Sequence, residues 1–306
     1  HNSKEYNGFK MLIDGAPFCG ADIDALGRMI DAGDFESGAG SMRREGFLTR
    51  YVDRLLTDYN RDGRDLTVVW DCGNATAGAV LPTLVKGLTG RHILLNERID
   101  GNFPAHAPDS SKPENLRELS ETVLREKADL GLAFDGDSDR LGVVDSRGKM
   151  VGVDNLLPIF AEEILKSHPN AVFIADVKSG KSFSSEIERL GGRPLIWKTG
   201  HSFIKRKMRE TGAPLGGEMS GHICFADKYF GFDDALYAAI RLLNIAGDRQ
   251  NAPLQNRIDQ IPETFATPEI GIPCPDAEKF EVVEKIKTAL ARDGIDFDAT
   301  DGVKRT

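Results

Sequence analysis

The sequence predicts an α/β protein of more than one domain, with helices on both faces of its sheets. At 306 residues the chain is long enough for two or three domains, each burying an apolar core of its own. Its 40% hydrophobic and 28% charged residues are typical of soluble globular proteins and exclude a disordered or fibrous class. Short apolar runs alternate with longer amphipathic segments, as in layered α/β domains.

The first 60 residues lack a long hydrophobic period. We interpret residues 1–45 as the C-terminal part of a domain and predict a connecting helix near 46–58. The α/β pattern then begins within a unit at 46–150. Its predicted strands lie at 66–71, 92–97, 130–135 and 141–145, and its predicted helices lie near 77–88 and 113–127. Pro113 opens the second helix, where proline favours the first turn.

A second α/β series follows in residues 151–262. Its predicted strands lie at 171–176 and 193–197, and its predicted helices lie near 155–167, 183–190, 201–210 and 234–246. The similar rhythm indicates two domains of like architecture. Residues 263–306, with a helix near 277–291, are typical of the start of a further domain.

Charge and cysteine content limit the partners. The net charge of -9 repels nucleic acid and anionic lipid, so we expect neither as a partner. The four cysteines form no C-x-x-C pair, which argues against a disulfide framework or structural zinc and favours a reducing cytoplasm. No apolar run approaches the roughly 20 residues that span a bilayer, and no signal peptide is visible at the start.

Three aspartates stand at alternate positions directly after a predicted strand. In the segment AFDGDSDRLG (133–142), Asp135, Asp137 and Asp139 would repel one another unless a cation neutralised them. A hard divalent ion with oxygen ligands resolves that conflict. Arg140 adds a planar, always protonated group that could hold a phosphoryl group beside the metal, or simply pair with the aspartates.

Other aspartate loops fit this segment less well. An EF-hand loop also begins D-x-D-x-D, but Arg140 replaces its glycine and Ser146 its final glutamate. A haloacid-dehalogenase-type phosphatase begins D-x-D, but Asp139 stands where that class has threonine. A solvated acidic turn is the remaining alternative.

A glycine-rich segment, GGEMSGHICF (216–225), brings Glu218, Ser220 and His222 onto one short turn. A carboxylate and a hydroxyl two residues apart can address neighbouring hydroxyls of a sugar. A polar turn between two strands explains the same residues about as well.

Basic residues follow two predicted strand ends. WKTGHSFIK (197–205) carries His201 with two lysines around a helix start, and DVKSGKSF (176–183) carries Lys178 and Lys181. Either group alone is typical of surface charge on a capped helix. Open α/β sheets bind ligands at the carboxyl ends of their strands, so together these groups indicate an anion site.

Four motifs occur in one order: HNSKEYNGFK, DGDSDR, KTGHSFIK and GEMSGH. This order resembles the α-D-phosphohexomutase superfamily, and GEMSGH is most similar to its phosphomannomutase/phosphoglucomutase branch. The motifs span residues 1–222, and the α/β rhythm between them fits that family's four-domain fold. The resemblance implies mixed sheets sandwiched by helices and incomplete first and fourth domains. Residues 1–45 would end domain 1, 46–150 would form domain 2, 151–262 domain 3, and 263–306 the start of domain 4.

The resemblance also implies roles for individual residues. Asp135, Asp137 and Asp139 would bind Mg²⁺, and Arg140 would stand beside a phosphoserine. Lys10 matches the lysine that assists transfer, and either Lys10 or His201 would handle the hydroxyl proton. Glu218 and Ser220 would grip the 3- and 4-hydroxyls of the sugar. The cleft would be lined by Lys178, His201 and His222.

The activity implied is that of an isomerase, which interconverts hexose 1-phosphate and hexose 6-phosphate through a phosphoserine and a bisphosphate intermediate. Mannose and glucose are the expected hexoses. The family's serine would lie one residue before His1, and Ser3 occupies the family's proline position. The family's fourth-domain phosphate loop would follow residues 301–303. We therefore expect negligible turnover from the chain as given.

Two alternatives stay open at this stage. Phosphoglucosamine mutase shares the architecture, but its sugar loop usually carries glutamine where Met219 stands. A non-catalytic fragment that binds Mg²⁺ and sugar phosphate is the other.

Overall fold

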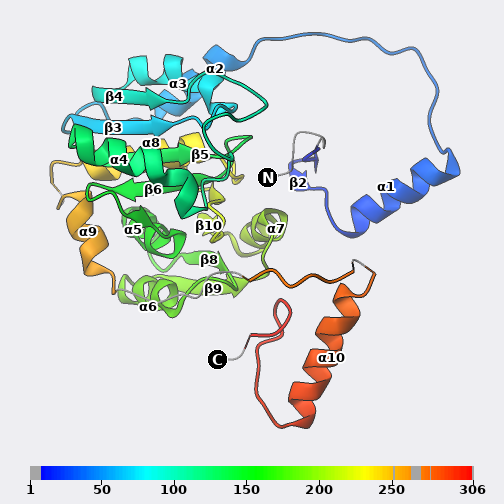
Figure 1. Cartoon of the computed structure of the whole chain (residues 1–306). Helices are drawn as coiled ribbons and strands as arrows, with labels where there is room; N and C mark the ends of the chain where they lie inside the picture. The colour runs from blue at the N-terminus through cyan, green and yellow to red at the C-terminus, as the bar shows by residue number, and fades with distance from the viewer. Residues whose placement is uncertain (1–7, 251, 263–269, 276, 305–306) are drawn as a thin grey trace.

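The computed structural model describes residues 8–250, 252–262, 270–275 and 277–304 (Figure 1). The first seven residues of the HNSKEYNGFK motif lie outside these ranges, so the predicted matches at His1 and Ser3 are outside the described residues. The fold is a mixed α/β arrangement, as the sequence predicts. No helix among the described residues combines the length and apolar character needed to cross a membrane.

The first sheet has five strands in the order β4-β3-β5-β6-β7. They are β3 (Leu66–Asp71), β4 (Gly90–Leu95), β5 (Leu130–Phe134), β6 (Leu141–Asp145) and β7 (Met150–Val151). β3 runs parallel to β4 and β5, whereas β6 pairs antiparallel with β5 and β7, so the sheet is mixed. Its helices are α3 (Ala77–Leu84), α4 (Arg117–Glu126), and the 3₁₀ turns η1 (Val85–Gly87) and η2 (Pro113–Leu116). Each of the four predicted strands is present within two residues of its predicted bounds.

The second sheet has four strands in the order β11-β10-β8-β9. They are β8 (Val172–Asp176), β9 (Arg193–Trp197), β10 (Leu215–Gly217) and β11 (Ile223–Phe225). β10, β8 and β9 are parallel, and β11 turns back antiparallel to β10. The helices are α5 (Val153–Leu165), α6 (Lys181–Arg189), α7 (His201–Thr211), α8 (Ala235–Gly247) and α9 (Leu254–Gln260).

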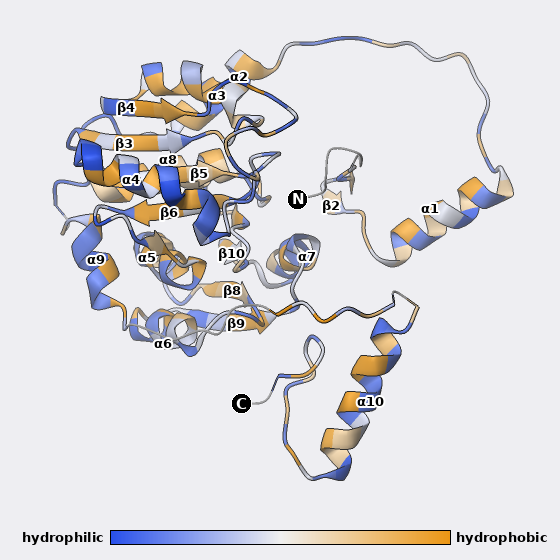
Figure 2. Ribbon diagram, viewed as in Figure 1, coloured by the Kyte–Doolittle hydropathy of each residue, from blue (hydrophilic) through white to orange (hydrophobic). Residues whose placement is uncertain are grey.

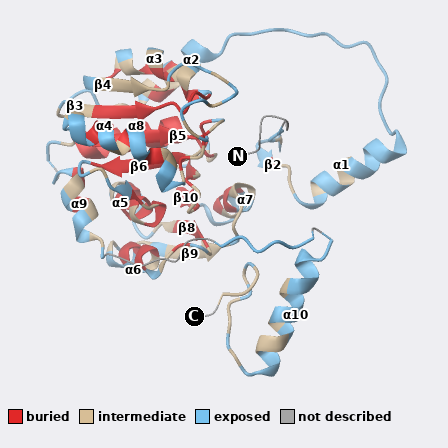
Figure 3. Ribbon diagram, viewed as in Figure 1, coloured by how far each residue is buried: buried red, intermediate tan, exposed pale blue. Residues whose placement is uncertain are grey.

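The largest buried cluster of the described residues spans both sheets, and each sheet also has a smaller buried cluster of its own. The largest buried cluster includes Trp70 and Phe134 from the first sheet, Phe173 from the second and Tyr237 from α8. α8 touches both β6 and β11, and it also contacts α5 and α2 (Leu48–Thr57). α8 is apolar nearly all round and is buried along almost its whole length, as a helix with neighbours on several sides must be (Figures 2 and 3).

The ends of the described chain lie outside this core. The hairpin β1 (Leu12–Ile13) and β2 (Ala16–Pro17) leads into α1 (Ala21–Ala32), and α10 (Lys279–Arg292) lies near the other end. Neither α1 nor α10 contains a buried residue, and both stand apart from the two sheets (Figure 3). α10 agrees with the helix predicted near 277–291, whereas no helix was predicted at α1.

Candidate functional site

Three parallel strands deliver the predicted basic and acidic residues to one edge of the second sheet. Ala175 of β8 pairs with Gly217 of β10, and Asp176 of β8 pairs with Trp197 of β9. The segments that follow the three strands therefore start side by side. Lys178 and Glu218 lie in two of these loops, and His201 is the first residue of α7, directly after the third. Lys178 is exposed just beyond the end of β8.

Residues 135–140, which we call the carboxylate loop, follow the carboxyl end of β5. Asp135 is fully buried, and its Oδ1 accepts the backbone N–H groups of Asp139 and Arg140, each at 3.1 Å. Its Oδ2 accepts a 2.6 Å hydrogen bond from Arg140 Nε. Burial raises the pKa of Asp135, and the Arg140 guanidinium opposes that shift. One carboxylate oxygen from each of Asp135, Asp137 and Asp139 lies within 4.8 Å of the others.

The side chain of Lys10 contacts this loop. Its Nζ donates to Asp137 Oδ2 at 2.9 Å and also contacts Asp139 Oδ2. Burial by itself raises the pKa of Asp137, but the hydrogen bond and the charge of Lys10, together with hydrogen bonds inside the loop, lower that pKa below its ordinary value. The three converging oxygens are the ligand type that a hard divalent cation prefers, so the loop fits such an ion, with Lys10 as its competitor.

Arg140 is held from a second side by a residue that the sequence analysis missed. Its Nη1 lies 3.5 Å from Asp109 Oδ1, and the neighbouring Ser110 Oγ donates to the Arg140 carbonyl at 3.2 Å. Asp109 follows no periodic segment, so only the folded structure shows its contact with Arg140.

Backbone contacts join the carboxylate loop to the glycine-rich turn between β10 and β11. Arg140 and His222 form an antiparallel bridge, and the Leu141 N–H donates to the Gly221 carbonyl at 3.0 Å. Gly221 has a φ of 105° and lies so close that an added Cβ would stand 3.1 Å from Arg140 Cβ. The two motifs, distant in sequence, thus form one site.

The glycine-rich turn holds Glu218 in a buried position. Glu218 Oε1 accepts the N–H of Gly200, and its Oε2 accepts a 3.2 Å hydrogen bond from Ser220 Oγ. The residue is only 3% exposed. The two side chains predicted to bind sugar hydroxyls therefore contact each other.

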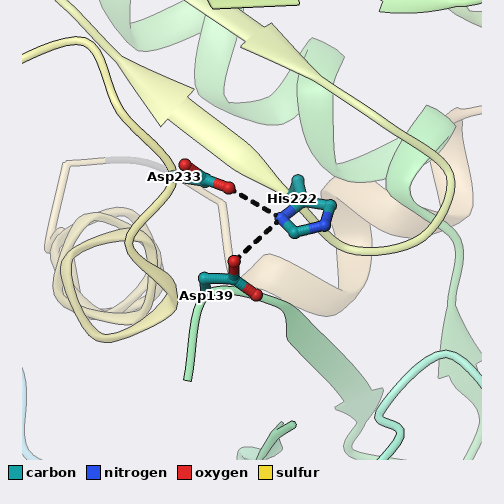
Figure 4. Close-up of side chains that lie close together, drawn as sticks. All are labelled: Asp139, His222 and Asp233. Atoms are coloured by element: carbon teal, nitrogen blue, oxygen red, sulfur yellow. Dashed lines mark ion pairs between the residues drawn. The ribbon is translucent and has the colours of Figure 1, made fainter. Parts of the chain in front are cut away.

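Two stacked histidines, His201 and His222, lie against Asp233, a residue that no sequence pattern indicated. Figure 4 shows His222 with its ion-pair contacts to Asp233 and Asp139. The rings of His201 and His222 lie 4.9 Å apart at 20°. Asp233 Oδ2 lies 3.1 Å from His201 Nδ1 and 2.9 Å from His222 Nδ1, and Asp233 Oδ1 accepts from Lys205 Nζ at 2.7 Å. Burial raises the pKa of Asp233, but the two histidines and Lys205 outweigh it and hold that pKa far below its usual range.

This cluster touches the carboxylate loop, because His222 Nδ1 lies 3.6 Å from Asp139 Oδ2. Asp139, His222 and Asp233 are close enough together to hold a metal ion. However, the ammonium groups of Lys10 and Lys205 already contact the two carboxylates. Lys205 therefore offsets the charge of Asp233, and Lys10 is shared between Asp139 and Asp137.

The C-terminal segment meets the same edge of the second sheet. Lys304 Nζ donates to the Val177 carbonyl at 2.8 Å, and the Thr199 N–H donates to Asp301 Oδ2 at 2.8 Å. These contacts bring residues near the end of the chain next to the loops that carry Lys178 and His201.

Family models and related enzymes all place the chain with phosphoglucomutases and phosphomannomutases. Residues 49–148 and 153–265 match the families described as phosphoglucomutase/phosphomannomutase alpha/beta/alpha domain II and domain III. A phosphomannomutase/phosphoglucomutase of Pseudomonas aeruginosa is 44% identical over 293 residues, which cover 96% of this chain and 62% of that protein. The enzyme of the same name from Pseudomonas syringae pv. tomato is 43% identical over 304 residues, covering 99% of this chain and 65% of that one.

A solved structure agrees with these relatives. The crystal structure of a phosphoglucomutase/phosphomannomutase family protein from Burkholderia thailandensis superimposes with a TM-score of 0.90 at 40% identity. It matches 100% of this chain, which spans 65% of that protein. The chain thus covers less than two thirds of the length of each of these three proteins.

Proposed function

The chain belongs to the α-D-phosphohexomutase superfamily. From this premise we propose that it belongs to an enzyme that interconverts hexose 1-phosphate and hexose 6-phosphate. In that enzyme the carboxylate loop would bind the metal and the glycine-rich turn would bind the sugar. Mannose and glucose phosphates are the proposed substrates. The observation that carries the proposal is the backbone bridge between Arg140 and His222. It places the carboxylate loop and the glycine-rich turn side by side, where one substrate can meet both.

The carboxylate loop would hold Mg²⁺ through Asp135, Asp137 and Asp139. When bound, this ion offsets the negative charge of a transferring phosphoryl group. Arg140 is already fixed on two sides, by Asp135 Oδ2 at 2.6 Å and by Asp109 Oδ1 at 3.5 Å. A guanidinium held in this way can bind phosphate oxygens with little further loss of side-chain entropy.

The remaining residues orient the sugar and handle its proton. Glu218 and Ser220 would bind two neighbouring hydroxyls near the middle of the ring, which suits a sugar that binds in two orientations. Lys178 would attract the phosphate at the far end of the sugar. Lys10 or His201 would exchange the proton of the reacting hydroxyl, and Lys10 already lies on the carboxylate loop.

Substitution of Glu218 tests this proposal. The assay measures conversion of mannose 1-phosphate by a polypeptide that carries these residues together with the family's serine motif and phosphate loop. Loss of charge-assisted hydrogen bonds to two hydroxyls should lower kcat/KM by roughly 10- to 100-fold in Glu218→Gln. Glu186→Gln is the matched control, because Glu186 is also buried but lies on α6 and pairs with Arg189. Equal kcat/KM values for the two variants would refute the role of Glu218, and no conversion by the unsubstituted protein would refute the activity.

A further inference from the structure

The short segment of residues 106–110 contacts the carboxylate loop at two points. The Gly136 N–H, which lies between two of the proposed metal ligands, donates to the Pro108 carbonyl at 3.1 Å. Two positions further on, Asp109 Oδ1 lies 3.5 Å from Arg140 Nη1. Any change in the position of this segment therefore reaches the carboxylate loop through backbone and side chain alike.

His106 joins this segment to the end of β3. Its Nε2 lies 2.9 Å from Asp71 Oδ2, and its Nδ1 lies 2.9 Å from the Ala107 carbonyl oxygen. Asp71 is fully buried, and its other oxygen accepts hydrogen bonds from the Gly73 N–H at 2.9 Å and from the Asn96 amide at 3.1 Å. The carboxylate that meets the His106 ring is therefore itself held in place.

Both ring nitrogens of His106 face acceptors, and this determines the charge of the ring. A carbonyl oxygen and an ionised carboxylate only accept hydrogen bonds, so each nitrogen must carry a proton and the ring is an imidazolium. Among the described residues, the charged groups that act on the ring are Asp71 and Glu118, which lies in the first turn of α4. Asn96, which follows β4, is an uncharged side chain that binds both of these carboxylates. The hydrogen bond to Asp71 raises the pKa of His106, and burial opposes that shift.

His92 shows the opposite arrangement in the same sheet. Its Nδ1 accepts a hydrogen bond from Trp70 Nε1 at 3.1 Å, and its Nε2 lies 3.1 Å from the Thr89 carbonyl oxygen. One donor and one acceptor suit a neutral ring with its proton on Nε2, and burial lowers the pKa of His92. His92 is therefore a matched reference for His106, because both nitrogens of each ring have a partner.

We propose that His106, as an imidazolium, is a positioning residue: by joining the 106–110 segment to Asp71, it holds the carboxylate loop in the shape that receives its ion. A neutral ring would leave one lone pair facing an acceptor, so one of its two hydrogen bonds would be lost. The contacts of the segment with Gly136 and Arg140 would then weaken. The proposal deepens the proposed function and rests on it for the identity of the ion, but the effect of His106 on Gly136 does not require a bound ion.

Two NMR measurements on the 306-residue chain, without added metal, test the proposal. The first follows the ring nitrogens of His106 and His92 with pH, after assignment through backbone correlations. We expect both nitrogens of His106 to be protonated at pH 6, and one proton to be lost with a midpoint above the ordinary histidine pKa of about 6.5. His92 should lose its second proton below that value. A midpoint for His106 at or below about 6.5 would overturn the proposal.

The second measurement is amide hydrogen exchange of Gly136, expressed as a protection factor corrected for the intrinsic pH dependence of exchange. Because the pKa of His106 is raised in the folded chain, its contribution is full below about pH 6.5 and is lost as pH rises through the raised pKa. Gly136 protection should therefore fall roughly 2- to 10-fold between pH 6 and pH 9, the effect of one hydrogen bond. Gly148, whose N–H donates to the Asp145 carbonyl at 2.9 Å, is the reference amide and should keep its protection.

The variant His106→Asn assigns the effect to this ring. When folded, it should show the lower Gly136 protection at both pH values, because an amide side chain does not titrate. Equal protection of Gly136 at pH 6 and pH 9 in the native chain, or a fall that Gly148 shares, would overturn the proposal even if the variant does not fold. A fall that persists unchanged in His106→Asn would also overturn it. Neither measurement uses Mg²⁺ or mutase turnover, so failure here is distinguishable from failure of the proposed function.

Discussion

Gly221 stands where the carboxylate loop meets the glycine-rich turn, and its replacement by alanine should be costly. Its φ of 105° is rarely adopted by residues with a side chain, and an added Cβ would lie 3.1 Å from both Arg140 Cβ and the Leu141 carbonyl oxygen. Backbone strain of this kind costs about 1–3 kcal/mol. The crowded contact adds to that cost, because packed neighbours must shift by a few tenths of an ångström.

Gly212→Ala is a matched control for this substitution. Gly212 has a φ of 68° at the end of α7, and no heavy atom would lie within 4 Å of an added Cβ. Gly212→Ala should therefore lose only about 1–2 kcal/mol of unfolding free energy, through backbone strain alone. The entropy that alanine removes from the unfolded chain is the same at both positions.

Denaturant unfolding followed by circular dichroism measures both losses. We expect Gly221→Ala to lose roughly 1–2 kcal/mol more of its unfolding free energy than Gly212→Ala. Only Gly221→Ala should also weaken Mg²⁺ binding, since the Gly221 carbonyl holds the Leu141 N–H at the base of the carboxylate loop. Equal losses of stability in the two variants would show that the contact between the loops is not tight, and the reasoning would fail.

Three further substitutions and treatments have defined outcomes. Lys10→Met should tighten Mg²⁺ binding about two- to fivefold by calorimetry, because a half-exposed ammonium that competes for the carboxylates contributes only about 0.2–1 kcal/mol; weaker binding would contradict this. The hydrogen bond to Asp71 raises the pKa of His106. The protonated His106 ring therefore contributes its full stabilisation of the fold below the ordinary histidine pKa, and this contribution is lost as pH rises through the raised pKa. His106→Asn should therefore lose about 1–3 kcal/mol of unfolding free energy at pH 6 and less at pH 9, and a pH-independent loss would refute the charge on this histidine. Burial raises the pKa of Cys72 to about 12, so iodoacetamide at pH 8 should alkylate the exposed Cys274 and spare Cys72, as read by peptide mass spectrometry.

The long strands were predictable because each is a continuous apolar run. β3 and β5 are buried almost throughout, and such runs are typical of strands covered on both faces. The sequence suggested strands on either side of the glycine-rich turn but did not give the bounds of β10 and β11, because each has only three residues and two of the three in β10 are glycine. Pairing with β8 and the shared core stabilise them, and neither is visible in local sequence.

The carboxylate loop was predictable because its residues are adjacent and their charges conflict unless neutralised. Asp109 and Asp233 were not, because their roles depend on partners far along the chain. Asp109 meets Arg140 across 31 positions, and Asp233 meets Lys205 across 28. Contacts between residues so far apart in sequence can be identified only in the folded structure, where the sheets bring their loops together.

The buried cluster that spans both sheets explains how site residues far apart in sequence keep fixed positions relative to one another. α8 packs against both sheets, and its capping residue Asp234 is the neighbour of Asp233. The helix that fills the core between the sheets thus also fixes a carboxylate of the site. A substitution that loosens α8 should therefore disturb the histidine cluster as well as stability.

The most direct test of the central claim is calorimetric titration of Mg²⁺ into the chain and into two aspartate variants. The claim is that Asp135, Asp137 and Asp139 hold a divalent cation beside the sugar loop. We predict binding at a single site that is lost in Asp137→Asn and kept in Asp53→Asn, which removes an exposed carboxylate from α2. Absence of binding by the unsubstituted chain, or equal affinity in Asp137→Asn, would contradict the claim.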